Sequence, residues 1–573
     1  MYRGLAELAG WGRRRTVDAC SPAVVDFPSE TIWCPRCGSS LRVSKTSKRR
    51  LVTLVHGDIE AREIQRSCGV CRIVVRSNRL VQIVPRGQRY GYDVMVWVGL
   101  GRWVDRLQRV EIRDRLESCY GIRLSTGTIS ALADRFLAHL GALHQESVPA
   151  LRREMSRGYP LHIDATTHQG RGGQFICYDG WRNWVLHAGR IDGERTEEIR
   201  PVVEETVQWF GLPIAVVRDQ SKACKAAVAP LADAGVPDLL CHYHVLKNLG
   251  GRLLDRPYRR LKARWKRLHA DSTLKDLLRS LSHGATAAHM GLAAAVLWVL
   301  RGPASRPLPF PFGLVALEQL DRLTVLQDQL GTFVDLRRSK AVAEELETLQ
   351  QLVSDVGNDT DLTGLRAQIR QRQQVFDDVR RVFRLVDPTT DPQPTLPQLQ
   401  DEQIREVEND LTKYRAMLCR RILKATGDSE DALRSVLKVV DRVKGQLFGH
   451  PVIRDATGKI LFVVDRTNNP AEHFFSRQNQ AMRRRTGRKN LGRDLEDLPA
   501  EAALVHNLQQ PSYVRVVIGS IDQLPVRFAS VRPLTGSLRP RPFRHFEYRL
   551  KDACAQLLSP ENQPLHQALA TGS

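Results

Sequence analysis

Two Cys-x-x-Cys pairs near the N-terminus limit the local fold more than any other feature of this 573-residue chain. The pairs are Cys34–Cys37 and Cys68–Cys71, with thirty residues between them. Two such knuckles can place four thiolates tetrahedrally around one Zn²⁺, which leaves no open ligand position for catalysis. Strand-like residues, 51–55, lie between the pairs. We therefore expect a zinc-binding ribbon over 28–80 that is folded by a structural metal ion.

Four unrelated buried thiols, or a redox-active pair, are the alternatives for these cysteines. No thioredoxin-like sequence surrounds either pair, which disfavours redox chemistry. The chain has 11 cysteines, an odd number that fits a disulfide framework poorly. Close pairs of this kind suit metal binding in a reducing cytoplasm, where we expect the protein to be located.

The charge balance points to a polyanionic partner. Lys and Arg number 86 against 63 Asp and Glu, which gives a net charge of +23. Nucleic acid is the usual partner of such a chain, and an anionic membrane surface is the competing one. The most apolar stretch, 285–300, is too short to cross a bilayer. Hydrophobic residues at 42% and charged residues at 26% are typical of a folded globular protein and exclude disordered or collagen-like chains.

A helix-turn-helix is predicted within a DNA-binding domain over 91–150. The first helix covers 106–119, Gly121 lies in the turn, and Ser125 caps a second helix over 126–140. The start of that helix would contact DNA through Thr126, Thr128 and Ser130. An ordinary helical hairpin is the alternative.

The segment 159–241 changes to alternating strands and helices. We predict three consecutive strands, a helix, a buried strand, a second helix and a short strand that ends near Cys241. Residues 242–450 are helical in pattern, with a hairpin over 341–385 that turns at 357–359. A strand over 460–464 then leads into a helix that starts at Pro470.

Three carboxylates stand at the ends of these predicted elements. Asp164 ends the first strand, Asp219 ends the fourth, and Glu472 opens the helix after the strand 460–464. Three such groups can hold two divalent metal ions about 4 Å apart, the arrangement for in-line phosphoryl transfer. Asx turns at the aspartates and a capping box at Glu472 are the alternatives. Asp179 and Asp465, which also end strands, are the runners-up.

The order of these residues resembles the RNase H-like catalytic domain of DDE transposases. Cys241-His-Tyr-His244, twenty-two residues after Asp219, resembles the C/D-x-x-H motif of the Mutator-like superfamily and of related bacterial insertion-sequence transposases. Thr467-Asn-Asn-Pro-Ala-Glu472, followed by Arg-Arg-Arg-Thr-Gly at 483–487, is similar to their final-Glu motif. The 253-residue gap from Asp219 to Glu472 resembles members with a large helical insertion. The resemblance covers roughly residues 30–510.

This resemblance implies a multidomain α/β fold. An RNase H-like core, a mixed sheet flanked by helices, would be interrupted by an all-helical insertion and preceded by the zinc ribbon and the helix-turn-helix. The implied boundaries are 155–250 for the first part of the core, 251–455 for the insertion, 456–510 for the final part and 511–573 for a basic C-terminal tail.

The resemblance also implies the chemistry. The enzyme would bind double-stranded DNA, cleave at the ends of a mobile element, and join the exposed 3′-hydroxyls to target DNA. Asp164, Asp219 and Glu472 would hold two Mg²⁺ or Mn²⁺ ions, with Cys241 and His244 supporting the site. A homodimer or higher oligomer on paired ends, in the cytoplasm of a bacterium and associated with its nucleoid, is the family expectation.

Purely structural roles are the alternative for the motif residues. Cys241 could be a buried thiol at a strand end, and His244 a packed histidine in a first helical turn. A second zinc site formed with His242 lacks a fourth ligand nearby.

Basic residues cluster after the predicted active-site helix and would contact the phosphate backbone. They are Arg477, Arg483, Arg484, Arg485, Arg488 and Lys489. A second basic run, 45–50, is as consistent with a solvated face as with DNA binding.

Two further functions compete with transposition: a DNA-binding regulator derived from a transposase, and an RNase H-like nuclease without joining activity.

Overall fold

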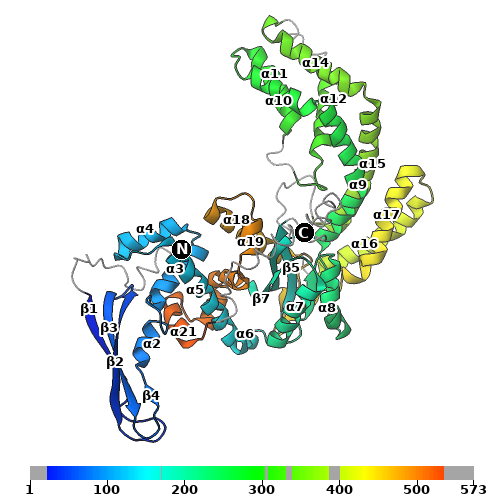
Figure 1. Cartoon of the computed structure of the whole chain (residues 1–573). Helices are drawn as coiled ribbons and strands as arrows, with labels where there is room; N and C mark the ends of the chain where they lie inside the picture. The colour runs from blue at the N-terminus through cyan, green and yellow to red at the C-terminus, as the bar shows by residue number, and fades with distance from the viewer. Residues whose placement is uncertain (1–21, 169–170, 304–307, 331–338, 386–400, 534–573) are drawn as a thin grey trace, which may run out of the picture. The chain divides into compact units, whose positions relative to one another are not determined.

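The computed structural model describes residues 22–168, 171–303, 308–330, 339–385 and 401–533 (Figure 1). It is a mixed α/β structure in which helices dominate. The chain divides into two compact units. The first comprises 1–216, 222–236 and 469–573, and the second comprises 217–221 and 237–468.

The first unit begins with a four-stranded sheet (Figure 1, blue). Its strands are β1 (Ala23–Pro28), β2 (Leu41–Thr53), β3 (Gly57–Cys68) and β4 (Val74–Val75). β2 and β3 form a long antiparallel hairpin, β1 runs parallel to β3, and β4 pairs with the end of β3. A small core of Phe27, Leu51, Ile59 and Leu80 lies beneath this sheet, where α2 (Asn78–Ile83) packs. The ribbon is longer than predicted, because it begins at Ala23.

Three helices follow and pack against one another: α3 (Tyr92–Trp103), α4 (Arg109–Tyr120) and α5 (Thr126–Glu146). α4 ends where Gly121 adopts a left-handed conformation at φ 65°, and the Ser125 hydroxyl caps α5 by accepting from the Thr128 N–H at 3.1 Å. The two predicted helices and their turn are therefore present. The first begins at Arg109 rather than Arg106, since Arg106 itself has a positive φ of 65°.

A five-stranded sheet carries the alternating segment. Its order is β7-β6-β5-β8-β9, so the strands read 3-2-1-4-5 when counted along this segment. The strands are β5 (Pro160–His168), β6 (Arg171–Asp179), β7 (Trp184–Ile191), β8 (Ala215–Arg218) and β9 (Asp238–Leu240). The first three are antiparallel neighbours, as the predicted strand sequence requires. α6 (Val148–Glu154) precedes the sheet, α7 (Thr196–Phe210) packs on β6 and β7, and α8 (Lys222–Asp233) packs on α7. The chain passes from one unit to the other within β8.

The C-terminal part of the first unit returns to this sheet. Its elements are α18 (Asn469–Thr486), α19 (Gly492–Glu496), the 3₁₀ segment η3 (Ala500–Gln509), α20 (Pro511–Val517), η4 (Ile521–Gln523) and α21 (Leu524–Ser530). α18 and α19 lie against β5 and β6, η3 against β7, and α21 against α3 and α5.

The part of the predicted basic C-terminal tail that the structure describes, 511–533, is mostly helical. α20 and α21 bury Tyr513 and Phe528 in the main core of this unit. Both helices are only seven residues long, so a helical period was hard to recognise in the sequence. The rest of the predicted tail, 534–573, lies outside the described residues.

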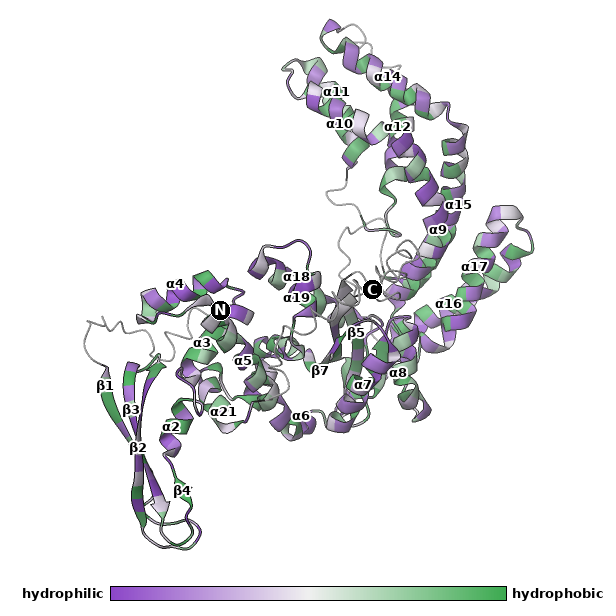
Figure 2. Ribbon diagram, viewed as in Figure 1, coloured by the Kyte–Doolittle hydropathy of each residue, from purple (hydrophilic) through white to green (hydrophobic). Residues whose placement is uncertain are grey.

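Helices make up most of the second unit, as predicted. They are α9 (His242–Arg267), α10 (Ala270–Leu281), α11 (Ala287–Arg301), α12 (Val315–Leu330), η1 (Lys340–Val342), α14 (Ala343–Gly357), α15 (Thr360–Phe383), α16 (Asp401–Ile422), α17 (Gly427–Val443) and η2 (Lys444–Gln446), followed by the β10 (Val452–Arg454)–β11 (Ile460–Val463) hairpin. α14 and α15 confirm the predicted helical hairpin. Apolar and polar residues alternate along these helices (Figure 2), and the apolar ones form a separate core.

Among the helices that the structure describes, none is long and apolar enough to cross a membrane.

Candidate functional site

The four N-terminal cysteines come together in space. Their sulfur atoms all lie within 4.8 Å of one another, although the two pairs lie thirty residues apart in the sequence. Cys34 and Cys68 are buried, whereas Cys37 is exposed and Cys71 is half-buried. The pairs meet because β3 carries Cys68 back beside the loop that holds Cys34. This tetrad could bind zinc, since sulfur is a preferred zinc donor and four ligands complete a structural site.

Each cysteine pair forms a tight knuckle. Gly38 N donates to Cys34 O at 2.9 Å, and Arg72 N donates to Cys68 O at 3.0 Å. Gly38 and Arg72 both have a positive φ, 71° and 57°, so the two turns have similar shapes. The Ser39 hydroxyl lies 3.4 Å from Cys37 Sγ, and hydrogen bonding from Ser39 and Cys71 lowers the pKa of Cys37 to about 6. The same Cys37–Cys71 hydrogen bond raises the pKa of Cys71 to about 12, so the two thiols share one proton and only one of them is readily deprotonated.

Asp164 lies in the middle of β5, not at its end. It pairs across the sheet with Ile176 of β6, and β5 continues four residues further to His168. The prediction of a strand end was wrong because the residues after Ala165 are polar and give no apolar signal, although this segment is paired with β6. The side chain is only half-buried and accepts from the Ala165 N–H at 2.9 Å.

Asp219 directly follows β8, as predicted, and its backbone is held by a buried ion pair in the second unit. Arg218, only 1% exposed, donates to Asp219 O at 2.8 Å. The same guanidinium donates to both carboxylate oxygens of Asp238 at 2.6 and 2.7 Å. Gln446 Nε2 adds a 2.6 Å bond to Asp238 Oδ2. The half-buried Asp219 side chain accepts from Ser221 N at 2.9 Å, so an Asx turn is also present.

Cys241 joins three pieces of the predicted motif within the second unit. It is fully buried as the N-cap residue of α9, and its N–H donates to Arg218 O at 2.7 Å. Its sulfur accepts from Asn468 N at 3.2 Å. The residue before Asp219, the start of the Cys-x-x-His segment and the Thr-Asn-Asn segment are thus connected through one residue, by its backbone N–H and its sulfur.

His242 has a structural role. Its side chain is fully buried, and Nε2 lies 2.7 Å from Leu447 O among the rings of Phe383, Phe448 and His450. Burial lowers the pKa of His242 well below its usual value, so the ring is neutral. His244 lies in the same first turn of α9 and is half-buried.

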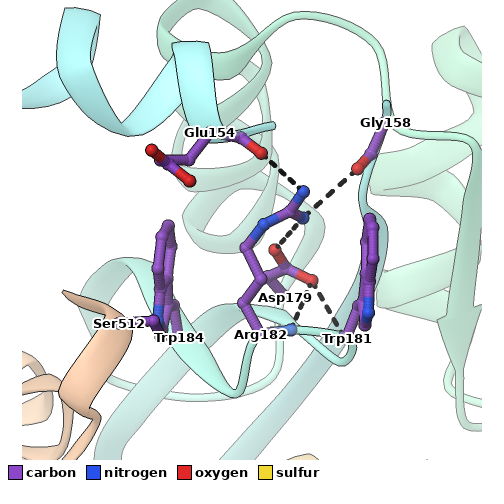
Figure 3. Close-up of polar contacts among 7 residues, drawn as sticks. All are labelled: Glu154, Gly158, Asp179, Trp181, Arg182, Trp184 and Ser512. Carbon is purple, nitrogen blue, oxygen red and sulfur yellow. Dashed lines mark hydrogen bonds and ion pairs between the residues drawn. The ribbon is translucent and has the colours of Figure 1, made fainter. Parts of the chain in front are cut away.

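Asp179, a runner-up for the first carboxylate, holds a turn instead. Its side chain is fully buried and accepts from the N–H groups of Trp181 and Arg182 at 2.9 and 3.2 Å. Arg182 pairs with the other carboxylate oxygen at 2.8 Å and lies between the rings of Trp181 and Trp184 (Figure 3). Burial raises the pKa of Asp179, and the ion pair opposes this effect. These internal bonds explain the residue without a catalytic role.

Glu472 lies in the first turn of α18 and is half-buried, within the first unit. α18 packs against β5, the strand that carries Asp164. In the sequence Glu472 follows Asn468 by four residues. The other runner-up, Asp465, is half-buried after β11.

The polar residues predicted to contact DNA on α5 are engaged in local bonds. Thr128 Oγ1 lies 2.9 Å from Ser125 Oγ, and Ser130 accepts from Arg109 at 3.2 Å. Thr126 is half-exposed at the helix start.

In the ribbon, two residues of the basic run 45–50 form ion pairs with acidic residues. Lys48 pairs with Glu60 at 3.4 Å and Arg50 with Asp58 at 2.6 Å across the hairpin.

The basic residues on and after α18 differ in how exposed their side chains are. Arg477, Arg483, Arg484, Arg488 and Lys489 are exposed, although Arg488 lies 3.5 Å from Asp494. Arg485 instead lies over the ring of Trp103, 4.3 Å from its centre. The sequence analysis did not single out Trp103 or the arginines around it. The many arginines over 102–115 could have indicated this region.

The chain matches no known protein-family model and no curated protein.

Proposed function

We propose that this chain is a DDE-type transposase that binds the ends of a mobile DNA element and catalyses metal-dependent cleavage and strand transfer. The observation that supports this most strongly is the bonding around Cys241. It connects the residue before Asp219 with the Asn468 segment that precedes Glu472, in the order that the motif resemblance requires. The central place of β5 in the five-stranded sheet also supports a site built on Asp164.

The donor set suits hard divalent cations. Asp164, Asp219 and Glu472 are all half-buried carboxylates, and carboxylate oxygens are the ligands that Mg²⁺ prefers. β5 and β8, neighbours in the sheet, carry Asp164 and lead into Asp219. In this proposal the three side chains would hold two Mg²⁺ or Mn²⁺ ions, which would supply Lewis-acid stabilisation of the attacking and leaving oxygens. Cys241 and Arg218 keep the backbone beside Asp219 in place.

The N-terminal modules would supply DNA recognition. The cysteine tetrad, with zinc bound, would fix the loops at the end of the ribbon. The three-helix arrangement of α3, α4 and α5 is the one in which a helix-turn-helix presents the start of its second helix to the major groove. Thr126 lies there, and the exposed arginines of α18 would contact backbone phosphates. Paired element ends would bring two or more copies of the chain together.

A strand-transfer assay tests the proposal. Purified protein, Mg²⁺ and a duplex carrying the DNA that flanks its gene would be incubated with a supercoiled plasmid. Joined products are expected with the wild-type chain and with Asp233→Ala, an exposed aspartate at the end of α8. They should disappear with Asp219→Ala, while binding of the ends persists. Joining that survives in Asp219→Ala contradicts the proposal.

The two competing functions predict different products. A regulator without chemistry would bind the ends but leave them uncut in Mg²⁺ and in Mn²⁺. A nuclease would stop at hydrolysed ends without strand transfer. The internal bonding of Asp179 removes the main alternative carboxylate, and this favours a site built on Asp164.

A further inference from the structure

A pocket in the first unit is lined by residues from α3, α18 and η3. Aromatic and aliphatic side chains form part of its wall, among them Phe474, Met482 and Val505. Its charged residues are Arg106 from the segment after α3, and Arg477 and Arg485 from α18. None of the residues that line it is a carboxylate. The pocket is partly open to solvent, so a phosphate at the surface of a duplex can reach its charged residues.

Trp103 connects this pocket to the helix-turn-helix. The indole Nε1 donates to Ala133 O of α5 at 3.1 Å, so the ring is fixed to the predicted recognition helix. Arg485 lies over that ring at 4.3 Å, which fixes α18 to the same point. The helix-turn-helix and the basic cluster of α18, far apart in the sequence, are therefore adjacent, and the pocket lies where they meet.

Several arginines lie close together here, with Asp134 and Asp494 as the carboxylates that oppose their charge. The Nε atom of Arg485 is buried and has no hydrogen-bond partner among the residues that the structure describes. Burial lowers the pKa of Arg485 to about 10. Burial, with the charges of Arg485 and Arg109 nearby, lowers the pKa of Arg102 to about 10 as well. An anion in the pocket would relieve this repulsion and provide acceptors for the guanidinium groups.

We propose that this pocket binds a backbone phosphate of duplex DNA, with Arg106 and Arg477 as its ligands, and that it joins the helix-turn-helix and α18 into one continuous DNA-binding surface. This inference rests on the proposed function, because it takes DNA as the substrate. Arg485 and Trp103 act as the support of the site. Arg106 is pre-positioned by its left-handed backbone, and Arg477 is exposed on α18, eight residues before the half-buried Arg485.

The test measures DNA binding without divalent metal. The Kd of a fluorescein-labelled 30-bp duplex is determined by anisotropy between 50 and 200 mM KCl for the wild-type chain and for Arg106→Gln/Arg477→Gln. Each lost phosphate contact should reduce the slope of log K against log[salt] by about 0.9, so the double variant, which loses one phosphate, should lose a slope of about 0.9. Arg434→Gln removes a charge that pairs with Glu430 on α17 and serves as the control with an unchanged slope.

Three other outcomes are decisive. A double variant with the wild-type Kd and slope overturns the inference and leaves the proposed function standing. A wild-type chain that does not bind the duplex overturns both. A second arm compares thermal unfolding in inorganic phosphate with unfolding in chloride of equal ionic strength. If phosphate stabilises the wild-type chain but not the double variant, while the DNA slope is the same in both, the pocket takes a free phosphate compound and the DNA inference is wrong.

Discussion

Arg218 and Asp238 form a two-pronged ion pair inside the second unit, with Nε and Nη2 at 2.6 and 2.7 Å from the two carboxylate oxygens. The side chain of Arg218 is 2% exposed and that of Asp238 is 12% exposed. The same guanidinium holds the backbone carbonyl of Asp219. A buried pair of this kind is costly to break, because the remaining partner keeps a charge that water cannot reach.

Asp238→Asn should therefore destabilise the chain by about 3–5 kcal/mol, the usual cost of removing one partner from a buried ion pair. The free energy of unfolding would be measured by urea denaturation followed by tryptophan fluorescence. Asp255→Asn is the matched control, since Asp255 pairs with Arg259 on the exposed face of α9 and exposed pairs contribute little to stability. Equal losses in the two variants would show that the buried pair has no special role.

The cysteine tetrad predicts metal content. The purified chain should contain one Zn²⁺ per molecule, measured by elemental analysis, because four thiolates complete one tetrahedral site. Cys34→Ser should lose the metal and increase the proteolysis of the segment around 29–40. Cys419→Ser, which changes an exposed cysteine of α16, should retain both the metal and the wild-type digestion pattern. A metal-free wild-type chain would contradict the site.

Residue patterns alone predicted the order of the elements from β5 to β9, because most of these strands contain a short apolar run. They misplaced the end of β5, because its polar second half pairs with β6 through the backbone and gives no apolar signal.

The contacts that hold the candidate site were also not predictable from the sequence. Chain order identified Asp219 and Cys241, but the bonds that hold them come from Arg218, Asp238 and Asn468. The contact of Trp103 with Arg485 joins residues almost four hundred positions apart, and no local pattern reports such a contact.

His144 should make stability depend on pH. Its ring is fully buried, with Nε2 2.8 Å from Leu186 O and Nδ1 2.8 Å from the Tyr513 hydroxyl. Since a carbonyl only accepts, Nε2 carries the proton and Nδ1 accepts from Tyr513. Burial lowers the pKa of His144 to about 4 in the folded chain, below the usual 6.5. The unfolded chain therefore binds more protons between these values, and this contribution to stability is present above pH 6.5 and is lost as the pH falls toward 4.

The measurement compares urea unfolding at pH 7 and pH 5 for the wild-type chain and His144→Gln. The wild-type chain should lose about 2 kcal/mol more than the variant over this range, at about 1.4 kcal/mol for each pH unit below 6.5. His283→Gln, which changes an exposed histidine, should keep the wild-type pH dependence. If His144→Gln loses as much stability as the wild-type chain, His144 does not carry the effect.

Asp164 and Asp179 lie on neighbouring strands, and their substitutions should have opposite effects. Asp179→Asn removes the partner of Arg182 in a buried pair and should lower the free energy of unfolding by about 3–5 kcal/mol. Asp164→Asn changes a half-exposed side chain and should leave stability within about 0.5 kcal/mol of the wild type. In the strand-transfer assay the order reverses: Asp164→Asn should abolish joining, while Asp179→Asn, assayed below its unfolding temperature, should retain it. Loss of joining in Asp179→Asn alone would move the metal site to β6 and contradict the assignment of Asp164.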